Sequence, residues 1–211
     1  MHAWLGGRHV PLARICNPFP LAKPAAIHVE ERAPPPSARI LHAMYFEMFA
    51  QMKKQLRQME TWFTAAETFA TEKKFDPSVL LSARLAPDQF PLLRQVLIAC
   101  DTLKLGASRL TGKEAPSHAD TEQTFADLRS RIQSTLAYLD GFSASDFEGT
   151  ATRLVTQPRW EGKVMSGHDY FLEHVVPNFF FHTTLTYALL RHSGVSVGKR
   201  DYLGTLSQRM P

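Results

Sequence analysis

Apolar residues recur at helical spacing along most of the chain after residue 44. In the first such segment they are three or four positions apart, so they share one face of a helix, while charged residues such as Lys53 and Arg57 fall on the other face. The apolar positions are Tyr45, Phe49, Met52, Leu56, Met59 and Phe63. This pattern predicts an amphipathic helix over 44–70.

Three further segments carry a helical pattern. The second is expected to start at Pro87 or Asp88 and to end near Thr111, where Gly112 suits a left-handed exit. The third is expected over 121–140, with Asp120 or Thr121 as its N-cap, and the fourth over 167–192. Pro177 lies inside the fourth segment and should kink or divide it, because proline lacks the N–H that a helix interior requires.

The remaining segments complete an all-α architecture. Residues 142–166 favour short strands around Pro158, which predicts a small hairpin or an ordered loop. The helices therefore form an up-and-down four-helix bundle of one domain over 44–205, with a long connection before the last helix. Residues 199–204 are expected to fold back over the end of the bundle with Tyr202 and Leu203 as anchors, and 206–211 form a tail.

Residues 1–43 have a different composition. They contain half of the fourteen prolines, so no long helix is expected there, and we interpret them as a disordered extension. A second form of this interpretation is that the stretch lies upstream of the native product, whose translation then begins at Met44. A targeting peptide is the alternative, and a transit peptide fits better than a secretory signal because the first acidic residue is Glu30.

Charge and cysteine content exclude several classes of protein. The formal net charge is +4, but most of the excess lies in residues 1–43, and the body has no basic stripe, which argues against nucleic-acid binding. No apolar run approaches the roughly 18 residues of a membrane-spanning helix. Two cysteines cannot form a disulfide framework, so a cytoplasmic location is expected.

Polar residues within apolar helical stripes are the candidates for chemistry, since bundles place their sites between facing helices. His174, Asn178 and His182 follow one another at intervals of four, and Gln95 and Asp101 lie on the second helix. The residues favour a hydrogen-bonded polar network. A divalent-metal site built from His174, His182 and Asp101 is the alternative, since imidazole and carboxylate are its usual ligands.

The joined motifs of the body resemble domain-of-unknown-function family nineteen-ninety-three, a branch of the DinB/YfiT-like superfamily of putative metalloenzymes. The likeness covers about residues 45–205 and rests on QVLIACD at 95–101, RLTG at 109–112, PNFFFH at 177–182 and GKRDYLG at 198–204. Many members of this superfamily bind a divalent metal through three histidines. Carried onto this chain, the last histidine is His182, the one before it is replaced by Asn178, and the helix-two histidine is replaced by Gln95.

This exchange implies that the metal site of the superfamily is weakened or lost, because amide oxygens are poor ligands for zinc or nickel. We therefore expect a metal-free small-molecule pocket in which His182 is the catalytic proton carrier and Gln95, Asp101, Asn178 and Tyr187 bind the ligand. Whether a reaction occurs stays open. The alternatives are a non-catalytic bundle that forms a homodimer or binds a partner through Phe179–Phe181, and a metal-dependent transferase or hydrolase of DinB type.

Overall fold

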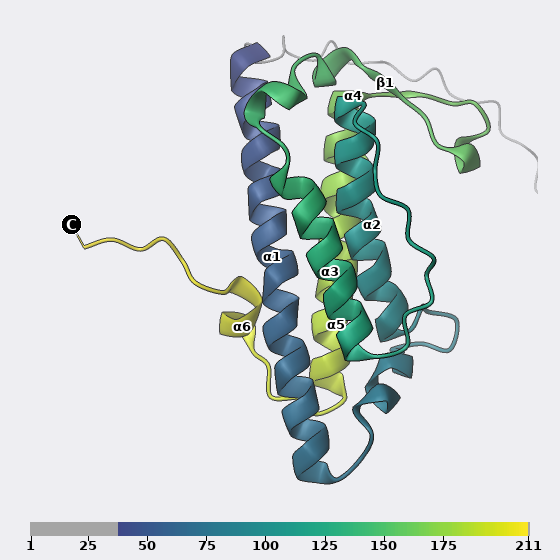
Figure 1. Cartoon of the computed structure of the whole chain (residues 1–211), viewed down its shortest axis with the longest axis vertical. Helices are drawn as coiled ribbons and strands as arrows, with labels where there is room; N and C mark the ends of the chain where they lie inside the picture. Colours follow the sequence, from purple (N-terminus) through teal and green to yellow (C-terminus); the bar gives the residue numbers. More distant parts are fainter. Residues whose placement is uncertain (1–37, 211) are drawn as a thin grey trace, which may run out of the picture. The chain divides into compact units, whose positions relative to one another are not determined.

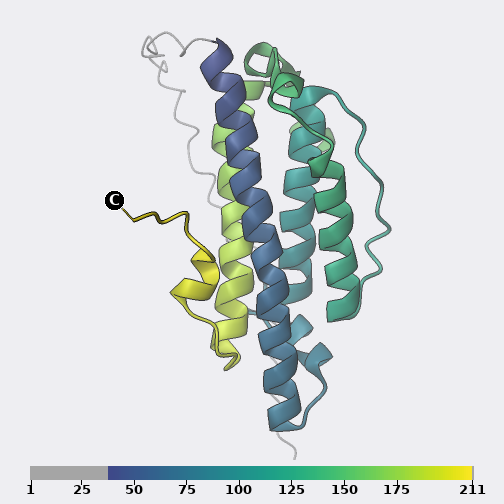
Figure 2. The same ribbon diagram turned by 60° about the vertical axis from the view of Figure 1, so that its left-hand side comes forward.

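A computed structural model describes residues 38–210. The predicted extension over 1–43 therefore lies almost entirely outside the described residues, and the predicted start at Met44 lies near their edge. Within this range four long helices form a bundle: α1 (Ala38–Lys73), α2 (Leu92–Thr111), α3 (Phe125–Asp140) and α5 (Val176–His192) (Figures 1 and 2). The predicted helical bundle is confirmed. None of the helices in this part of the chain combines the length and the apolarity that crossing a bilayer requires.

Shorter elements fill the connections. A 3-10 helix, Pro77–Ser82, lies between α1 and α2. The connection between α3 and α5 contains three 3-10 turns, Ala144–Phe147, Thr150–Thr152 and Pro158–Trp160. It also contains the strands β1 (Leu154–Val155) and β2 (Met165–Ser166) and the short helix α4 (Gly167–Tyr170). The two strands pair antiparallel, with Leu154 opposite Ser166, so the predicted hairpin is present. A π-helical turn, Phe171–Val175, joins α4 to α5, and α6 (Lys199–Leu203) follows α5.

Helix directions differ from a simple up-and-down order at one connection. Asp101 in α2 pairs with Arg131 in α3, and further along both helices the Lys113 carbonyl accepts a hydrogen bond from the Tyr138 hydroxyl at 3.1 Å. Contacts that advance together along both helices mean that α2 and α3 run parallel. The segment between them must therefore run back along the bundle, as Figure 1 shows.

Arg131 holds this connecting segment in place. Its buried guanidinium contacts Asp101 of α2 at 2.8 Å, and it also contacts Asp120 at 3.1 Å and Glu122 at 2.8 Å in the connection. Lys104 pairs with Asp101 at 3.0 Å as well. A buried cation needs such compensation, since its transfer out of water is costly. The network explains how an irregular segment follows one fixed path.

Three helix starts lie at other positions than the sequence pattern indicated. α1 begins at Ala38, before Met44, and Leu41 is buried in the core. α2 begins at Leu92, because a helix from Pro87 would carry Pro91 in its second turn, without an N–H and against a carbonyl. α3 begins at Phe125, where Thr124 and Asp127 form a reciprocal capping box that Asp120 and Thr121 lack.

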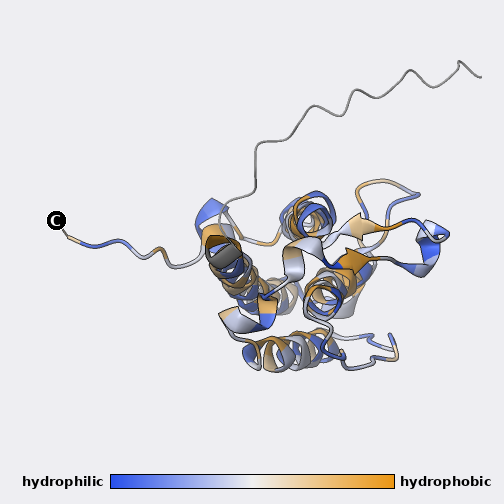
Figure 3. Ribbon diagram, turned by 90° about the horizontal axis from the view of Figure 1, so that it is seen from above, coloured by the Kyte–Doolittle hydropathy of each residue, from blue (hydrophilic) through white to orange (hydrophobic). Residues whose placement is uncertain are grey.

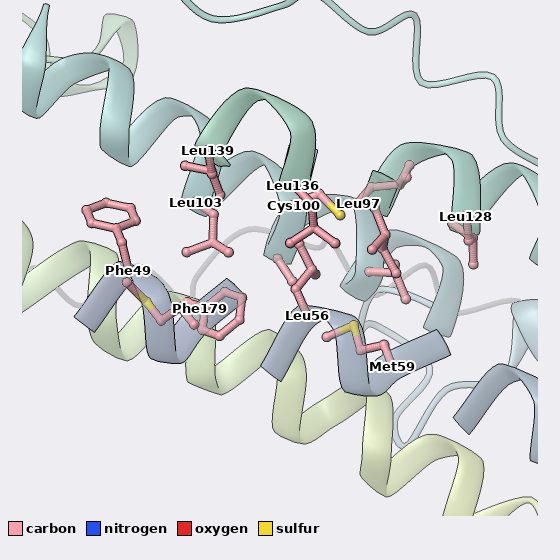
Figure 4. Close-up of a cluster of buried hydrophobic side chains, with 14 of the residues drawn as sticks. Phe49, Leu56, Met59, Leu97, Cys100, Leu103, Leu128, Leu136, Leu139 and Phe179 are labelled. Atoms are coloured by element: carbon pink, nitrogen blue, oxygen red, sulfur yellow. The ribbon is translucent and has the colours of Figure 1, made fainter. Parts of the chain in front are cut away.

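The core extends along the whole bundle. Figure 4 shows buried side chains from α1, α2, α3 and α5 packed between the helices, among them Leu56, Cys100, Leu136 and Phe179. In the view along the bundle, Figure 3, each long helix carries both hydrophobic and hydrophilic residues. Burial of one face of each amphipathic helix is the main force that stabilises such a fold.

The α6 segment folds back, as expected, but it packs along the side of α1 and α5 and not over the end of the bundle. The Tyr202 ring stacks on Trp62 with centroids 5.7 Å apart, and the Trp62 indole N–H donates to the Asp201 carbonyl at 3.0 Å. Leu203 is 40% exposed, so Tyr202 is the stronger anchor of the two predicted residues.

Gly167 fixes the base of the hairpin. Its N–H donates to the Arg153 carbonyl at 2.7 Å, and a Cβ at this position would lie 2.0 Å from the Thr150 carbonyl oxygen. Only glycine permits this close approach between the two backbones.

Candidate functional site

A cavity of about 340 Å³ lies between α2, the hairpin turn and the segment from α4 to α5. This volume is at the lower end of the range of about 300–1,000 Å³ that is usual for small-molecule pockets. The residues that line the cavity are Phe90, Arg94, Ile98, Asp101, Thr102, Leu105, Arg109, Gln157, Arg159, Tyr170, His174, Asn178 and His182.

A π turn directly before Pro177 shapes one wall of this cavity. Pro177 has no N–H and its ring would collide with the carbonyl of Glu173 in a regular α-helix. Instead the Val176 N–H bonds to the Phe171 carbonyl, which closes a wider turn. The helix thus continues past the proline, and His174, Asn178 and His182 line the same cavity. Single π turns of this kind are often found at functional sites.

His182 is held by Gln95 across the interface of α2 and α5. The Gln95 Nε2 group donates to the Phe90 carbonyl at 2.8 Å, so its Oε1 atom faces His182 Nδ1 at 2.6 Å. Because an amide oxygen only accepts, the Nδ1 atom carries the proton. The Nε2 atom of His182 is then a lone-pair acceptor, and it has no hydrogen-bond partner among residues 38–210.

Burial keeps the His182 ring neutral. The residue is 7% exposed, and desolvation lowers the pKa of the imidazole to about 4. A charged imidazolium would lose its hydration here without gaining a carboxylate partner, which is why the pKa falls. At neutral pH His182 is therefore a hydrogen-bond acceptor at Nε2.

Asn178 and Asp101 also line the cavity, each with a partner of its own. The Asn178 amide donates from Nδ2 to Thr102 Oγ1 at 2.7 Å. Asp101 Oδ1 accepts from Arg131 at 2.8 Å and from Lys104 at 3.0 Å. The charge of Asp101 is thus compensated by the network that holds the α2–α3 connection.

His174 lies at the hairpin end of the cavity. Its ring stacks on Tyr170 with centroids 5.2 Å apart, and Arg159 donates to its Nε2 atom at 2.8 Å. Since arginine can only donate, the proton of this neutral ring is on Nδ1. Burial lowers the pKa of His174, and the charges of Arg159 and Arg109 lower it further. The Nδ1 donor is buried and has no partner within the part of the chain that the structure describes.

Sequence reasoning missed the arginines of this cavity. Arg109 donates to the Tyr170 hydroxyl at 2.9 Å, and Arg94 pairs with Asp120 at 2.9 Å. A signal for both existed, because Arg94, Asp101 and Arg109 recur at a helical spacing on one face of α2. No comparable signal points to Gln157 or Arg159, which reach the cavity from the hairpin loop.

Two predicted ligand-binding residues, Gln95 and Tyr187, do not line this cavity. Gln95 is connected to it through its hydrogen bond to His182, whereas Tyr187 lies elsewhere. Its ring packs edge-on against Trp62 at 5.9 Å and Tyr202 at 5.6 Å, under α6. The expected aromatic run also divides, since Phe179 is fully buried while Phe181 is 57% exposed.

The donor set at this position does not fit the three-histidine metal site that the resemblance implies. Both ends of the Gln95 amide are already hydrogen bonded, and Asn178 is a weak ligand. The alternative set is also engaged, because His174 Nε2 accepts from Arg159 and Asp101 pairs with two cations. Within residues 38–210 no three His, Cys, Asp or Glu residues are grouped as a metal site.

Comparisons with known proteins agree with the fold. Residues 44–203 match DUF1993, described as a domain of unknown function. A comparison with curated proteins finds no match. A crystal structure of a DinB family member protein from Shewanella denitrificans has a TM-score of 0.80 at 49% sequence identity, and the match covers 82% of this chain and 99% of that chain. The chain therefore belongs to the DUF1993 family, within the DinB-like group of helical bundles.

Proposed function

We propose that this chain binds a small molecule in the cavity between α2 and α5, with His182 as the group that accepts a hydrogen bond or a proton from it. The observation that carries the proposal is the chain of contacts from the Phe90 carbonyl through Gln95 to His182. It fixes the imidazole in one tautomer and leaves the Nε2 lone pair without a partner among the described residues. An uncharged imidazole with a vacant acceptor suits recognition of an N–H or O–H group on the ligand, and with a pKa of about 4 it is a weak general base at neutral pH.

Asn178 extends the polar surface beside His182. Its Nδ2 group bonds to Thr102, so the amide plane is fixed and the oxygen remains available to a ligand. Ile98 and Leu105 supply the apolar part of the wall between these polar groups. A few oriented polar groups among apolar side chains are the usual composition of a small-molecule site. The role proposed for His182 requires no metal. A cytoplasmic location and association into a homodimer stay predictions from the sequence.

A thermal-shift screen with a metabolite library tests the binding function. Compounds that raise the melting temperature of the wild-type chain should lose this effect in His182→Gln. The matched control is His192→Gln, which removes an exposed histidine from the same helix and should keep the effect. Ligands that stabilise His182→Gln as much as wild type would contradict the role of His182.

The tautomer can be measured directly. Nitrogen-15 chemical shifts should show His182 protonated on Nδ1 at pH 7, and Gln95→Met should remove this preference because methionine offers no amide oxygen. A His182 ring protonated on Nε2 in the wild-type chain would overturn the proposed acceptor, whatever the screen finds.

A further inference from the structure

Hydrogen-bond donors accumulate at the hairpin end of the cavity. Arg109 donates to the Tyr170 hydroxyl and Arg159 donates to the His174 ring, and both of these acceptors are neutral. Neither arginine forms an ion pair with a carboxylate in the described part of the chain. Two guanidinium groups without a counter-charge on one cavity wall are unusual, since such clusters are repulsive until an anion lies between them.

Two buried N–H groups at the same end have no acceptor. Gln157 is 7% exposed and lines the cavity, and its Nε2 atom has no hydrogen-bond partner in residues 38–210. The Nδ1 donor of His174 is unpartnered as well. Buried donors are nearly always paired in native proteins, so two unpaired donors on residues that line the same cavity indicate a missing acceptor.

The other charged residues of the cavity do not supply this acceptor. Arg94 pairs with Asp120, and Asp101 is held by Arg131 and Lys104 on the side of α3. His182, at the opposite end, is neutral. The uncompensated charge of the cavity is therefore positive, and it comes from Arg109 and Arg159.

We infer that the ligand of this cavity is an anion, a small organic molecule whose carboxylate or phosphate group lies between Arg109 and Arg159 and accepts from Gln157. This inference rests on the proposed function, that the cavity binds a small molecule. Oxyanions match arginine because its planar fork donates two parallel hydrogen bonds to two oxygens.

The two ends of the cavity also set the shape of this ligand. His174 and His182 are eight residues apart, which is about 12 Å along a helix at 1.5 Å per residue. A molecule that reaches both ends is elongated, with its anionic group at the hairpin and its uncharged end beside His182. Ile98 and Leu105 line the stretch between these ends.

Matched probes test the anion requirement. The carboxylate pair is 4-phenylbutyrate and its neutral amide, 4-phenylbutyramide, and the phosphate pair is phenyl phosphate and phenol. Titration calorimetry at low ionic strength should show the anion of one or both pairs binding at least tenfold more tightly than its neutral partner. The pair that responds identifies the preferred oxyanion.

Variants assign the effect to the two arginines. Arg159→Gln should weaken binding of the anion about 10- to 100-fold, the value of one charge-assisted hydrogen bond. Arg159 is exposed on the hairpin turn, so its replacement leaves the core unchanged. Arg109→Gln should have an effect of the same size. The control is Arg153→Gln, an exposed arginine of the same connection that does not line the cavity and should bind the anion like wild type.

The outcomes separate this inference from the proposed function. Equal binding of a neutral probe and its anion, abolished by His182→Gln, would overturn the anion requirement while the small-molecule function stands. Anion binding that depends on Arg159, together with a His182 ring protonated on Nε2, would support the inference and refute the proton acceptor. The inference is contradicted if an anion binds Arg159→Gln and Arg109→Gln as tightly as it binds the wild-type chain. It is also contradicted if none of the four probes binds.

Discussion

Replacement of His182 by glutamine should change how the stability of the bundle depends on pH. The folded chain keeps His182 neutral, with a pKa of about 4, because burial removes the hydration that a charged ring needs. The unfolded chain exposes the ring, whose ordinary pKa is about 6.5. Glutamine keeps an amide that can bond to Gln95, but it does not titrate.

The sign follows from where the proton binds. Well above pH 6.5 neither state is protonated at His182, and the contribution of the ring to stability is fully present. As the pH falls from there towards 4, only the unfolded chain takes up the proton, so stability is lost. A difference of about 2.5 pKa units corresponds to about 3 kcal/mol in total, of which about 2 kcal/mol is lost between pH 7.0 and pH 5.0.

Urea denaturation followed by circular dichroism at several pH values measures this effect. The wild-type free energy of unfolding minus that of His182→Gln should decrease by about 2 kcal/mol between pH 7.0 and pH 5.0. Contributions from His118 and His174, whose pKa values are also lowered, occur in both proteins and cancel. His192→Gln should follow the wild-type curve. A wild-type advantage over His182→Gln that is the same at both pH values would refute the reasoning.

Three further changes have expected outcomes. Arg131→Met should lower the free energy of unfolding by about 3–5 kcal/mol, because three carboxylates lose the cation that they share. The control Arg129→Met removes one partly exposed ion pair, and it should lower the free energy of unfolding by about 1 kcal/mol or less in the same denaturation assay. Gly167→Ala should cost about 2 kcal/mol or more, since its Cβ meets a backbone oxygen, and Gly141→Ala, where the nearest atom is 3.4 Å away, should cost less; equal melting temperatures would contradict this. Burial raises the pKa of the Cys100 thiol to about 12, so this thiol should not react with a thiol reagent at pH 8 in the folded chain. Mass spectrometry should find the peptide that contains Cys100 unlabelled until urea unfolds the chain.

The fold could be predicted because the apolar period is strong in each helix. The stripe from Tyr45 to Phe63 is buried as expected. Helix starts were less accurate, since they depend on single hydrogen bonds. The capping box of Thr124 and Asp127 involves side chains that could also cap from other positions, so composition alone left Asp120 and Thr121 as equal candidates.

The direction of α3 depends on contacts that no local pattern encodes. A connection of this length permits either a return along the bundle or a crossing at its end. The choice is made by Arg131, which contacts Asp101 on α2 and Asp120 on the connection at once. Such long-range ion pairs become visible only when the helices are packed.

The candidate site was predicted where polar residues interrupt apolar helices. Gln95 and His182 form a hydrogen bond, and Asn178 and Asp101 line the same cavity as His182. Tyr187 was assigned by its helical phase from Asn178, but α6 packs over it instead. Gln157 belongs to an irregular loop, where spacing along the chain says little about position in space.

The charged cluster around Arg131 has a consequence for how this chain can diverge. Loss of any one acidic partner leaves part of a guanidinium charge uncompensated in the protein interior. Loss of the arginine removes the cation that Glu122 pairs with, and it leaves Asp101 and Asp120 with Lys104 and Arg94 as their remaining partners. Descendants of this sequence can therefore leave the arrangement only by exchanging several members together for an apolar set. We expect drift to be slow at these four positions and fast on the solvent-facing residues between them.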